Sequence, residues 1–206
     1  MNADVILTKI LTLPGIIVGL SFHEFAHAWV SDRLGDPTPR RQGRVTLNPL
    51  AHIDWIGFLM LLVVGFGWGK PVQIDPGYYK HRRRDEFLVS IAGVTMNLIL
   101  AILFAIPARF MLNKYASGGA SSFIQDLYLM IFYTVSINLV LMIFNLIPCP
   151  PLDGWGIVTQ LFGLEKYSWW YKVYQYGTYI LLALIIFNVT DLIITPAVTF
   201  LLHVLI

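Results

Sequence analysis

Long apolar stretches, separated by short polar segments, dominate the chain. The main runs cover residues 5–30, 87–111, 124–147, 173–189 and 192–206. A helix of about 20 residues crosses a bilayer, and several of these runs reach that length. The pattern predicts an all-α polytopic membrane protein with about five transmembrane helices. Asp191 and Pro196 are expected to separate the last two runs, which would form a C-terminal helical hairpin over residues 173–206.

A further apolar run, residues 53–68, is shorter and carries three glycines. Basic residues lie on both sides of it: Arg33, Arg40, Arg41, Arg44, Lys70, Lys80, Arg82, Arg83 and Arg84. Because lysine and arginine gather on the cytoplasmic side of a membrane, both ends of this run are expected on that side. Residues 53–75 are therefore predicted to form a re-entrant hairpin. It would consist of a short helix and a short β-like return through residues 67–74.

The composition agrees with a membrane protein and excludes several other classes. Apolar residues make up 57% of the chain and charged residues 13%, and the net charge is +2. Soluble domains carry roughly 25% charged residues. The balance excludes a disordered protein and a nucleic-acid partner, since nucleic acids require a basic surface. The single cysteine, Cys149, excludes an internal disulfide. The length suits one membrane-embedded domain, residues 1–206, and carries no signal of the oligomeric state.

The distribution of positive charge predicts the orientation in the cell membrane. Only Lys9, Arg109 and Lys114 fall on the side opposite to the other lysines and arginines. This assignment places the C-terminal ends of the first run and of the run at 124–147 near the cytoplasm. Both ends carry candidate chemistry, so an active site near the cytoplasmic side is expected.

The segment His23-Glu24-Phe25-Ala26-His27 has the pattern H-E-x-x-H within an apolar helical run. Residues four apart lie on one face of a helix, so both imidazoles can bind one metal ion, and Glu24 can serve as a general base toward water. The alternative is two core histidines and a glutamate in a helix–helix contact. Three ionisable groups this close in a membrane helix are costly without a partner, which favours the metal.

Asp153 is the best candidate for a third metal ligand. It lies in Asn145-Leu-Ile-Pro-Cys-Pro-Pro-Leu-Asp-Gly154, where three prolines prevent a regular helix and free the aspartate to turn inward. The alternative is an aspartate that caps the next helix. Two histidines and one carboxylate form a ligand set that favours zinc, and a catalytic zinc usually has three protein ligands.

Together these segments resemble the site-2 protease family of intramembrane zinc metalloproteases, in its compact bacterial and archaeal branch. The fixed positions of its two motifs, H-E-x-x-H and N-x-x-P-x-P-x-L-D-G, all match: His23, Glu24, His27, Asn145, Pro148, Pro150, Leu152, Asp153 and Gly154. Residues 47–54 and 67–72 extend the resemblance, which covers about residues 19–156. Two positions depart from the family: Val94 replaces the proline of A-G-P-x-x-N, and Trp55 replaces the proline after H-I-D.

The resemblance implies proteolysis of single-span transmembrane substrates within or at the edge of the bilayer. One zinc ion per chain would be held by His23, His27 and Asp153, and Glu24 would activate the water. Asn97 and Asn145 are candidates to bind the substrate or the oxyanion, and hydrogen bonding between helices is the alternative role. In the return, Val72 and Ile74 alternate with polar residues, as expected of a strand that pairs with an extended substrate.

His52 and Asp54, at the mouth of the predicted re-entrant segment, have two interpretations. They could form a gate or an auxiliary metal contact, or they could be a polar turn that begins a helix.

Two other functions compete with proteolysis. A non-proteolytic zinc-containing protein could bind or regulate membrane partners, but the presence of Glu24, which a structural zinc site does not need, argues against it. A metal transporter needs a polar path to the outer side, and Asp126, Asn138 and Asn188 are too few to form one.

Overall fold

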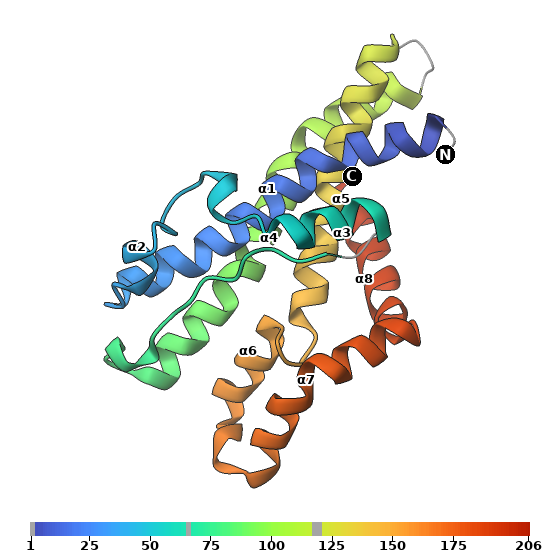
Figure 1. The fold of residues 1–206 in the computed structure, drawn as a ribbon. Helices are drawn as coiled ribbons and strands as arrows, with labels where there is room; N and C mark the ends of the chain where they lie inside the picture. The colour runs from blue at the N-terminus through green and yellow to red at the C-terminus, as the bar shows by residue number, and fades with distance from the viewer. Residues whose placement is uncertain (1–2, 65–66, 117–120) are drawn as a thin grey trace.

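The computed structural model describes residues 3–64, 67–116 and 121–206, and these residues are almost entirely helical (Figure 1). The helices are α1 (Ala3–Arg33), α2 (Thr38–Arg41), α3 (Trp55–Val64), α4 (Arg82–Ala116), α5 (Ser122–Leu146), α6 (Asp153–Phe162), α7 (Ser168–Ile186) and α8 (Val189–Leu205). Short 3-10 turns occur at Pro49–Ala51, Pro76–Tyr78 and Leu164–Lys166. The predicted all-α class is confirmed.

Three of the described helices are long and apolar enough to cross a membrane: Val5–Arg33, Arg82–Leu112 and Ser122–Leu146. Helices α7 and α8 meet this criterion only as a pair, and the pair is bent by 70°. The described residues thus contain three spans, or four if the bent pair counts as one, and the predicted number of five is not confirmed. The bend lies at Asn188, whose φ of 55° is left-handed, and Pro196 lies inside α8 rather than at the break.

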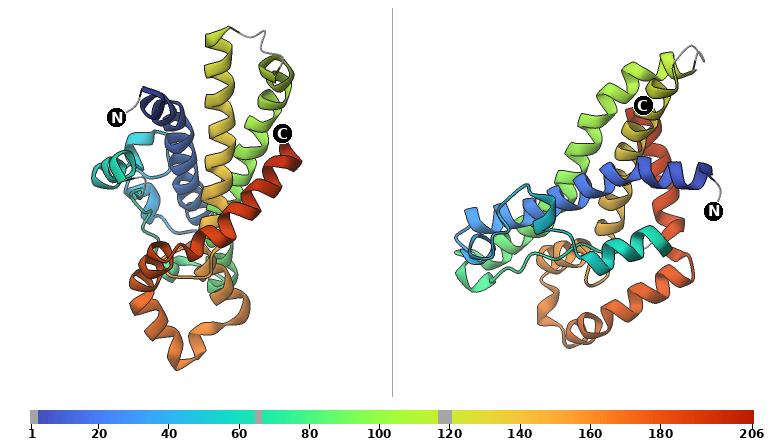
Figure 2. Two further views of the ribbon diagram at one scale, coloured as in Figure 1. Left: turned by 90° about the vertical axis from the view of Figure 1, so that its right-hand side faces the viewer. Right: turned by 45° about the horizontal axis from the view of Figure 1, so that its top comes forward.

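Helices α1, α4 and α5 form the centre of the molecule. Helix α4 packs most extensively against α5, and α1 contacts both of them. Figures 1 and 2 show α8 beside α5, while α6 and α7 lie at the other end of α5 from its first residue, Ser122. Small residues such as Ala101 and Ala105 are almost fully buried between these helices and let them approach closely, while Val135 and Leu139 fill the space between them.

The segment after α2 matches the predicted re-entrant element in part. Helix α3 has ten residues and is about 15 Å long, half the thickness of the hydrocarbon core of a bilayer. An extended return then passes back alongside it, and a side chain at Gly57 would overlap the carbonyl oxygen of Trp68. A β-like return is not confirmed, because the only β pairing among the described residues is an isolated antiparallel bridge between Ile53 and Gly69.

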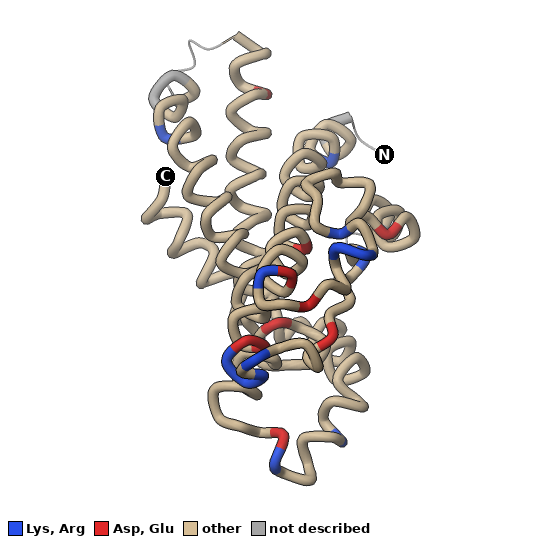
Figure 3. The backbone as a smooth tube through the Cα atoms, turned by 90° about the vertical axis from the view of Figure 1, so that its left-hand side faces the viewer, with Lys and Arg blue, Asp and Glu red and all other residues tan. Residues whose placement is uncertain are grey.

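Charged residues are concentrated in one part of the molecule. Figure 3 shows Lys, Arg, Asp and Glu gathered where α1 ends and α4 begins, whereas the far halves of α4 and α5 are almost free of charge. This division is what a bilayer requires of a multi-pass protein.

Candidate metal centre and active site

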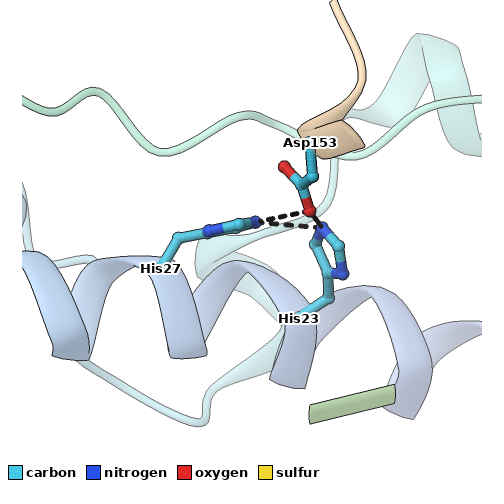
Figure 4. A group of neighbouring side chains, drawn as sticks. All are labelled: His23, His27 and Asp153. Carbon is cyan, nitrogen blue, oxygen red and sulfur yellow. Dashed lines mark hydrogen bonds and ion pairs between the residues drawn. The ribbon is translucent and has the colours of Figure 1, made fainter. Parts of the chain in front are cut away.

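Three side chains from two distant segments converge beside α1 (Figure 4). The Nε2 atoms of His23 and His27 are 3.1 Å apart, and each lies 3.3 Å from Oδ2 of Asp153. No other group of three or more His, Cys, Asp or Glu side chains in the described part of the chain could hold a metal ion. The structure thus brings together the three residues that the sequence predicted as ligands.

The geometry of this group fits a metal ion. Ligand atoms about 2.0–2.2 Å from a tetrahedral zinc lie roughly 3.3–3.6 Å from one another, close to the separations observed here. Each histidine turns its other ring nitrogen to an acceptor: Nδ1 of His23 to Oδ1 of Asn97, and Nδ1 of His27 to the carbonyl oxygen of Val89, both at 2.7 Å. Oδ2 of Asp153 is buried and has no hydrogen-bond partner among the residues that the structure describes. All three ligand atoms are therefore available to one cation.

Helix α4 covers the two imidazoles closely, and Gly93 makes this possible. A Cβ atom at Gly93 would lie 2.5 Å from Cε1 of His23 and would overlap Nε2 of His27. Only glycine leaves room for the rings, so the close approach of the α4 backbone to the candidate ligands explains the glycine at position 93. The main chain of α4 stays regular at Val94, where the family has proline.

The turn after α5 carries Asp153 back to the histidines. Helix α5 ends at Leu146, the proline-rich segment forms a turn, and Asp153 is the first residue of α6. A Cβ atom at Gly154 would lie 2.5 Å from the carbonyl oxygen of Ile147, so the first turn of α6 rests against the end of α5. Asp153 is therefore both the first residue of α6 and a member of the metal group.

Glu24 lines a cavity of about 260 Å³ together with the three candidate ligands. Its Oε2 accepts a hydrogen bond of 2.9 Å from the backbone N–H of Val72 in the extended return. Pro71, Val72 and Ile74 line the same cavity. Exposure alternates along the return, with Val72 and Ile74 half-buried and Pro71 and Gln73 exposed. The alternation expected of an extended segment is therefore present in the return.

A buried arginine also lies close to Oε2 of Glu24. A guanidinium nitrogen of Arg44 is 3.9 Å from Oε2 of Glu24, the same nitrogen donates to the carbonyl oxygen of Lys70, and the residue is only 4% exposed. Arg44 therefore joins the acidic side chain to the backbone of the return. Sequence reasoning missed this residue, because nothing in its local pattern distinguishes it from Arg40 or Arg41.

The two asparagine candidates have different surroundings. Asn145 lines the cavity, and its Nδ2 donates to the carbonyl oxygen of Leu141 at 3.0 Å. Asn97 is fully buried behind His23, where its side chain bonds to the ring, to the carbonyl oxygen of Gly19 and to Asn138. Asn145 thus faces the cavity, whereas Asn97 contacts a candidate ligand.

His52 and Asp54 lie apart from the metal group. Oδ1 of Asp54 accepts from the N–H of Gly57 at 2.8 Å, which is the geometry of a cap at the start of α3. His52 is fully buried, and its Nε2 lies 2.8 Å from the carbonyl oxygen of Thr46. The backbone carbonyl oxygen of His52 accepts a hydrogen bond from the N–H of Lys70. Burial lowers the pKa of His52 below its usual value, and the positive charge of Arg44 acts in the same direction.

The chain is similar to known metalloproteases. The model of peptidase family M50 matches residues 11–188. The candidate zinc metalloprotease YwhC of Bacillus subtilis is 40% identical over 146 residues, 71% of this chain and 66% of that protein. The candidate zinc metalloprotease Rip2 of Mycolicibacterium smegmatis is 28% identical, over 86% of this chain and 67% of that protein. The Rip2 of Mycobacterium tuberculosis H37Rv is 29% identical, over 71% of this chain and 55% of that protein.

The chain therefore spans about two-thirds of the length of the first of these relatives. No solved structure matches it at a significant level. The match to the family model covers most of the chain, including the H-E-x-x-H segment and Asp153. The chain belongs to peptidase family M50, the site-2 protease family.

Proposed function

We propose that this protein is an intramembrane zinc endopeptidase that hydrolyses peptide bonds of single-span transmembrane proteins. The observation that carries the proposal is the convergence of His23, His27 and Asp153 at tetrahedral spacing beside the carboxylate of Glu24. Family membership and the names of the relatives support it.

In this proposal each residue of the group has one role. His23, His27 and Asp153 hold one zinc ion, with both histidines bound through Nε2. Zinc bound there supplies a Lewis acid and lowers the pKa of water. Glu24, on the cavity wall, accepts a proton from the water that attacks the scissile carbonyl carbon. It then delivers the proton to the departing amide nitrogen.

Asn145 is the side chain that we assign to the oxyanion. It lines the cavity, and an amide NH₂ has two hydrogens, of which the carbonyl oxygen of Leu141 takes one. The second hydrogen is available to the negative oxygen that develops during attack. Asn97 is better suited to hold the ring of His23, because its polar atoms are engaged away from the cavity.

The substrate must be extended at the cleaved bond, since a helical peptide shields its carbonyl groups. We infer that it lies along the return, residues 69–74, by β-strand addition. The alternating exposure of the return and its place on the cavity wall support this role.

We also infer that the active site lies near the cytoplasmic face of the cell membrane. His27 is six residues before the end of α1, which is about 9 Å along the helix axis. Helix α4 begins nearby with three arginines, and such residues mark the cytoplasmic side.

The test uses the purified wild type and Glu24→Gln in detergent, each incubated with a panel of single-span membrane proteins. Cleavage by the wild type that is abolished by Glu24→Gln and by a zinc chelator is the expected result. Glu24→Gln should still bind one zinc per chain, because Glu24 is not a ligand. No cleavage across the panel with stoichiometric zinc in both proteins would favour a non-proteolytic binding role. Cleavage that survives Glu24→Gln would refute the mechanism.

A further inference from the structure

A chain of hydrogen bonds crosses the three central helices behind the metal group. Nδ1 of His23 on α1 lies 2.7 Å from Oδ1 of Asn97 on α4. Nδ2 of Asn97 donates to Oδ1 of Asn138 on α5 at 3.0 Å, and Nδ2 of Asn138 donates to the carbonyl oxygen of Thr134 at 2.8 Å. Both asparagines are fully buried. This series of hydrogen bonds thus connects His23, a candidate metal ligand, to Asn138, which touches neither the metal group nor the cavity.

The partners at the two ends fix the orientation of both amides. Nδ2 of Asn97 also lies 3.1 Å from the carbonyl oxygen of Gly19, and a carbonyl oxygen only accepts. The NH₂ group of Asn97 must therefore face Gly19, and its oxygen must face His23. The NH₂ group of Asn138 must likewise face the carbonyl oxygen of Thr134, so its oxygen faces Asn97. It follows that Nδ1 of His23 carries the hydrogen, which leaves the lone pair of Nε2 for a metal.

Asn138 completes this arrangement. The two hydrogens on Nδ2 of Asn97 have two acceptors, Gly19 and Asn138. Without Asn138, one N–H group would be buried without a partner, which is unfavourable in an apolar surrounding. The amide of Asn97 would then be held by Gly19 alone and could tilt away from His23. A weakened hydrogen bond to Nδ1 would no longer select the tautomer with hydrogen on Nδ1, and the other tautomer has no lone pair on Nε2 for the metal.

The backbone is built to bring these side chains together. A Cβ atom at Gly15 would lie 2.8 Å from Cα of Thr134, and one at Gly19 would lie 2.7 Å from Leu141 and 3.1 Å from Oδ1 of Asn138. Glycines four residues apart thus let α1 and α5 cross at close range. From the sequence alone, Asn138 is a candidate only for a polar path through the membrane.

We propose that Asn138 is a positioning residue for the metal site, acting through Asn97 to hold His23 in the metal-binding tautomer and orientation. The proposal rests on the metal ligands of the proposed function. It does not depend on whether the protein cleaves a substrate, because its test measures metal binding directly.

The experiment measures zinc affinity by chelator competition in detergent, together with the visible spectrum of the Co²⁺-loaded protein. Leucine has the branched shape of asparagine without its polar atoms. Asn138→Leu should therefore weaken zinc binding by about 10- to 100-fold and alter the Co²⁺ spectrum. The matched control is Thr134→Val, which removes a neighbouring buried hydroxyl whose one hydrogen bond among the described residues is to the carbonyl oxygen of Met130 in its own helix. It leaves the carbonyl oxygen of Thr134 in place and should keep wild-type affinity.

Two further variants separate positioning from general damage to the fold. Asn138→Asp retains an oxygen that accepts from Asn97, so it should bind zinc far more tightly than Asn138→Leu. If Asn138 acts through Asn97, the double variant Asn97→Leu/Asn138→Leu should bind zinc no more weakly than Asn97→Leu alone. Wild-type affinity in folded Asn138→Leu, equal losses in Asn138→Asp and Asn138→Leu, or additive losses in the double variant would each overturn the proposal.

Discussion

The backbone N–H of Val72 donates to Oε2 of Glu24 at 2.9 Å, which ties the extended return to the acidic residue of the H-E-x-x-H segment. The two residues are 48 positions apart in the sequence. A movement of the return therefore alters the position of the carboxylate, and a substrate that pairs with the return is held beside it. In the proposed mechanism, this contact would couple substrate binding to the position of the base.

Val72→Pro tests that coupling. Proline has no N–H and cannot donate to Glu24, so kcat/KM should fall by about 10- to 100-fold, the range expected for a hydrogen bond to a charged group. Val72→Ala keeps the N–H and loses only side-chain contacts, so it should retain most of the activity. The measurement is cleavage of one transmembrane substrate by both variants. Unchanged cleavage by Val72→Pro would argue against a role of the return in substrate binding.

Arg44→Gln should also loosen the contact between the return and Glu24. The guanidinium holds the carbonyl oxygen of Lys70 and lies 3.9 Å from Glu24, so its loss should lower kcat/KM by about tenfold or more while zinc content stays at one per chain. Arg41→Gln removes an exposed arginine three residues earlier and should leave the kinetics unchanged. Equal effects of the two variants would show that net charge, rather than this contact, is what matters.

Gly93→Ala should disturb the metal site without changing any polar group. The added methyl group would overlap the imidazoles of His23 and His27, and overpacking of this kind typically costs about 1–3 kcal/mol. We expect zinc affinity to fall at least about tenfold and cleavage to fall with it, since 1.4 kcal/mol is a factor of ten. Thr95→Ala, on an exposed face of the same helix, is the control. Full zinc affinity in Gly93→Ala would mean that α4 can move away from the rings.

The sequence was informative wherever a local pattern determines the geometry. The spacing of His23 and His27 and the prolines before Asp153 were enough to predict the metal group. The side of α4 that faces α1 was not predictable, because a helix that is apolar all round has no phase signal, so the contact of Asn97 with His23 stayed one of two alternatives. Arg44 was missed for a related reason: its role depends on tertiary contacts of a loop. The bend at Asn188 was expected instead at Asp191 and Pro196, since the left-handed conformation of an asparagine has no clear sequence signature.

Stability should fall in mild acid because of His52. Burial lowers the pKa of this side chain below 6.5, so the folded state binds a proton more weakly than the unfolded state does. The contribution of neutral His52 to the free energy of unfolding is complete above pH 6.5. It is lost as the pH falls below that value, and the free energy of unfolding then decreases by at most about 1.4 kcal/mol per pH unit. Thermal unfolding in detergent between pH 7.5 and 5.5 measures the effect.

His52→Gln should flatten this pH dependence, because glutamine does not titrate. His81→Gln removes a histidine at the molecular surface and should keep the wild-type slope. If His52→Gln and the wild type lose stability equally on acidification, the proton is taken up at another group.

Removal of the metal should destabilise the protein only where the three ligands are intact. A ligand that binds the folded state alone stabilises it by RT ln(1 + [L]/Kd), about 2.7 kcal/mol when its concentration is 100 times Kd. A chelator should therefore lower the unfolding temperature of the wild type, and added zinc should restore it. Asp153→Ala should unfold at one temperature with or without chelator, because two histidines alone bind zinc weakly.

The control for this measurement is Glu24→Gln, which should respond to the chelator as the wild type does. The two variants change acidic residues that line the same cavity, and only one of them is a proposed ligand. A chelator response in Asp153→Ala, or its loss in Glu24→Gln, would mean that the carboxylate ligand has been assigned to the wrong residue.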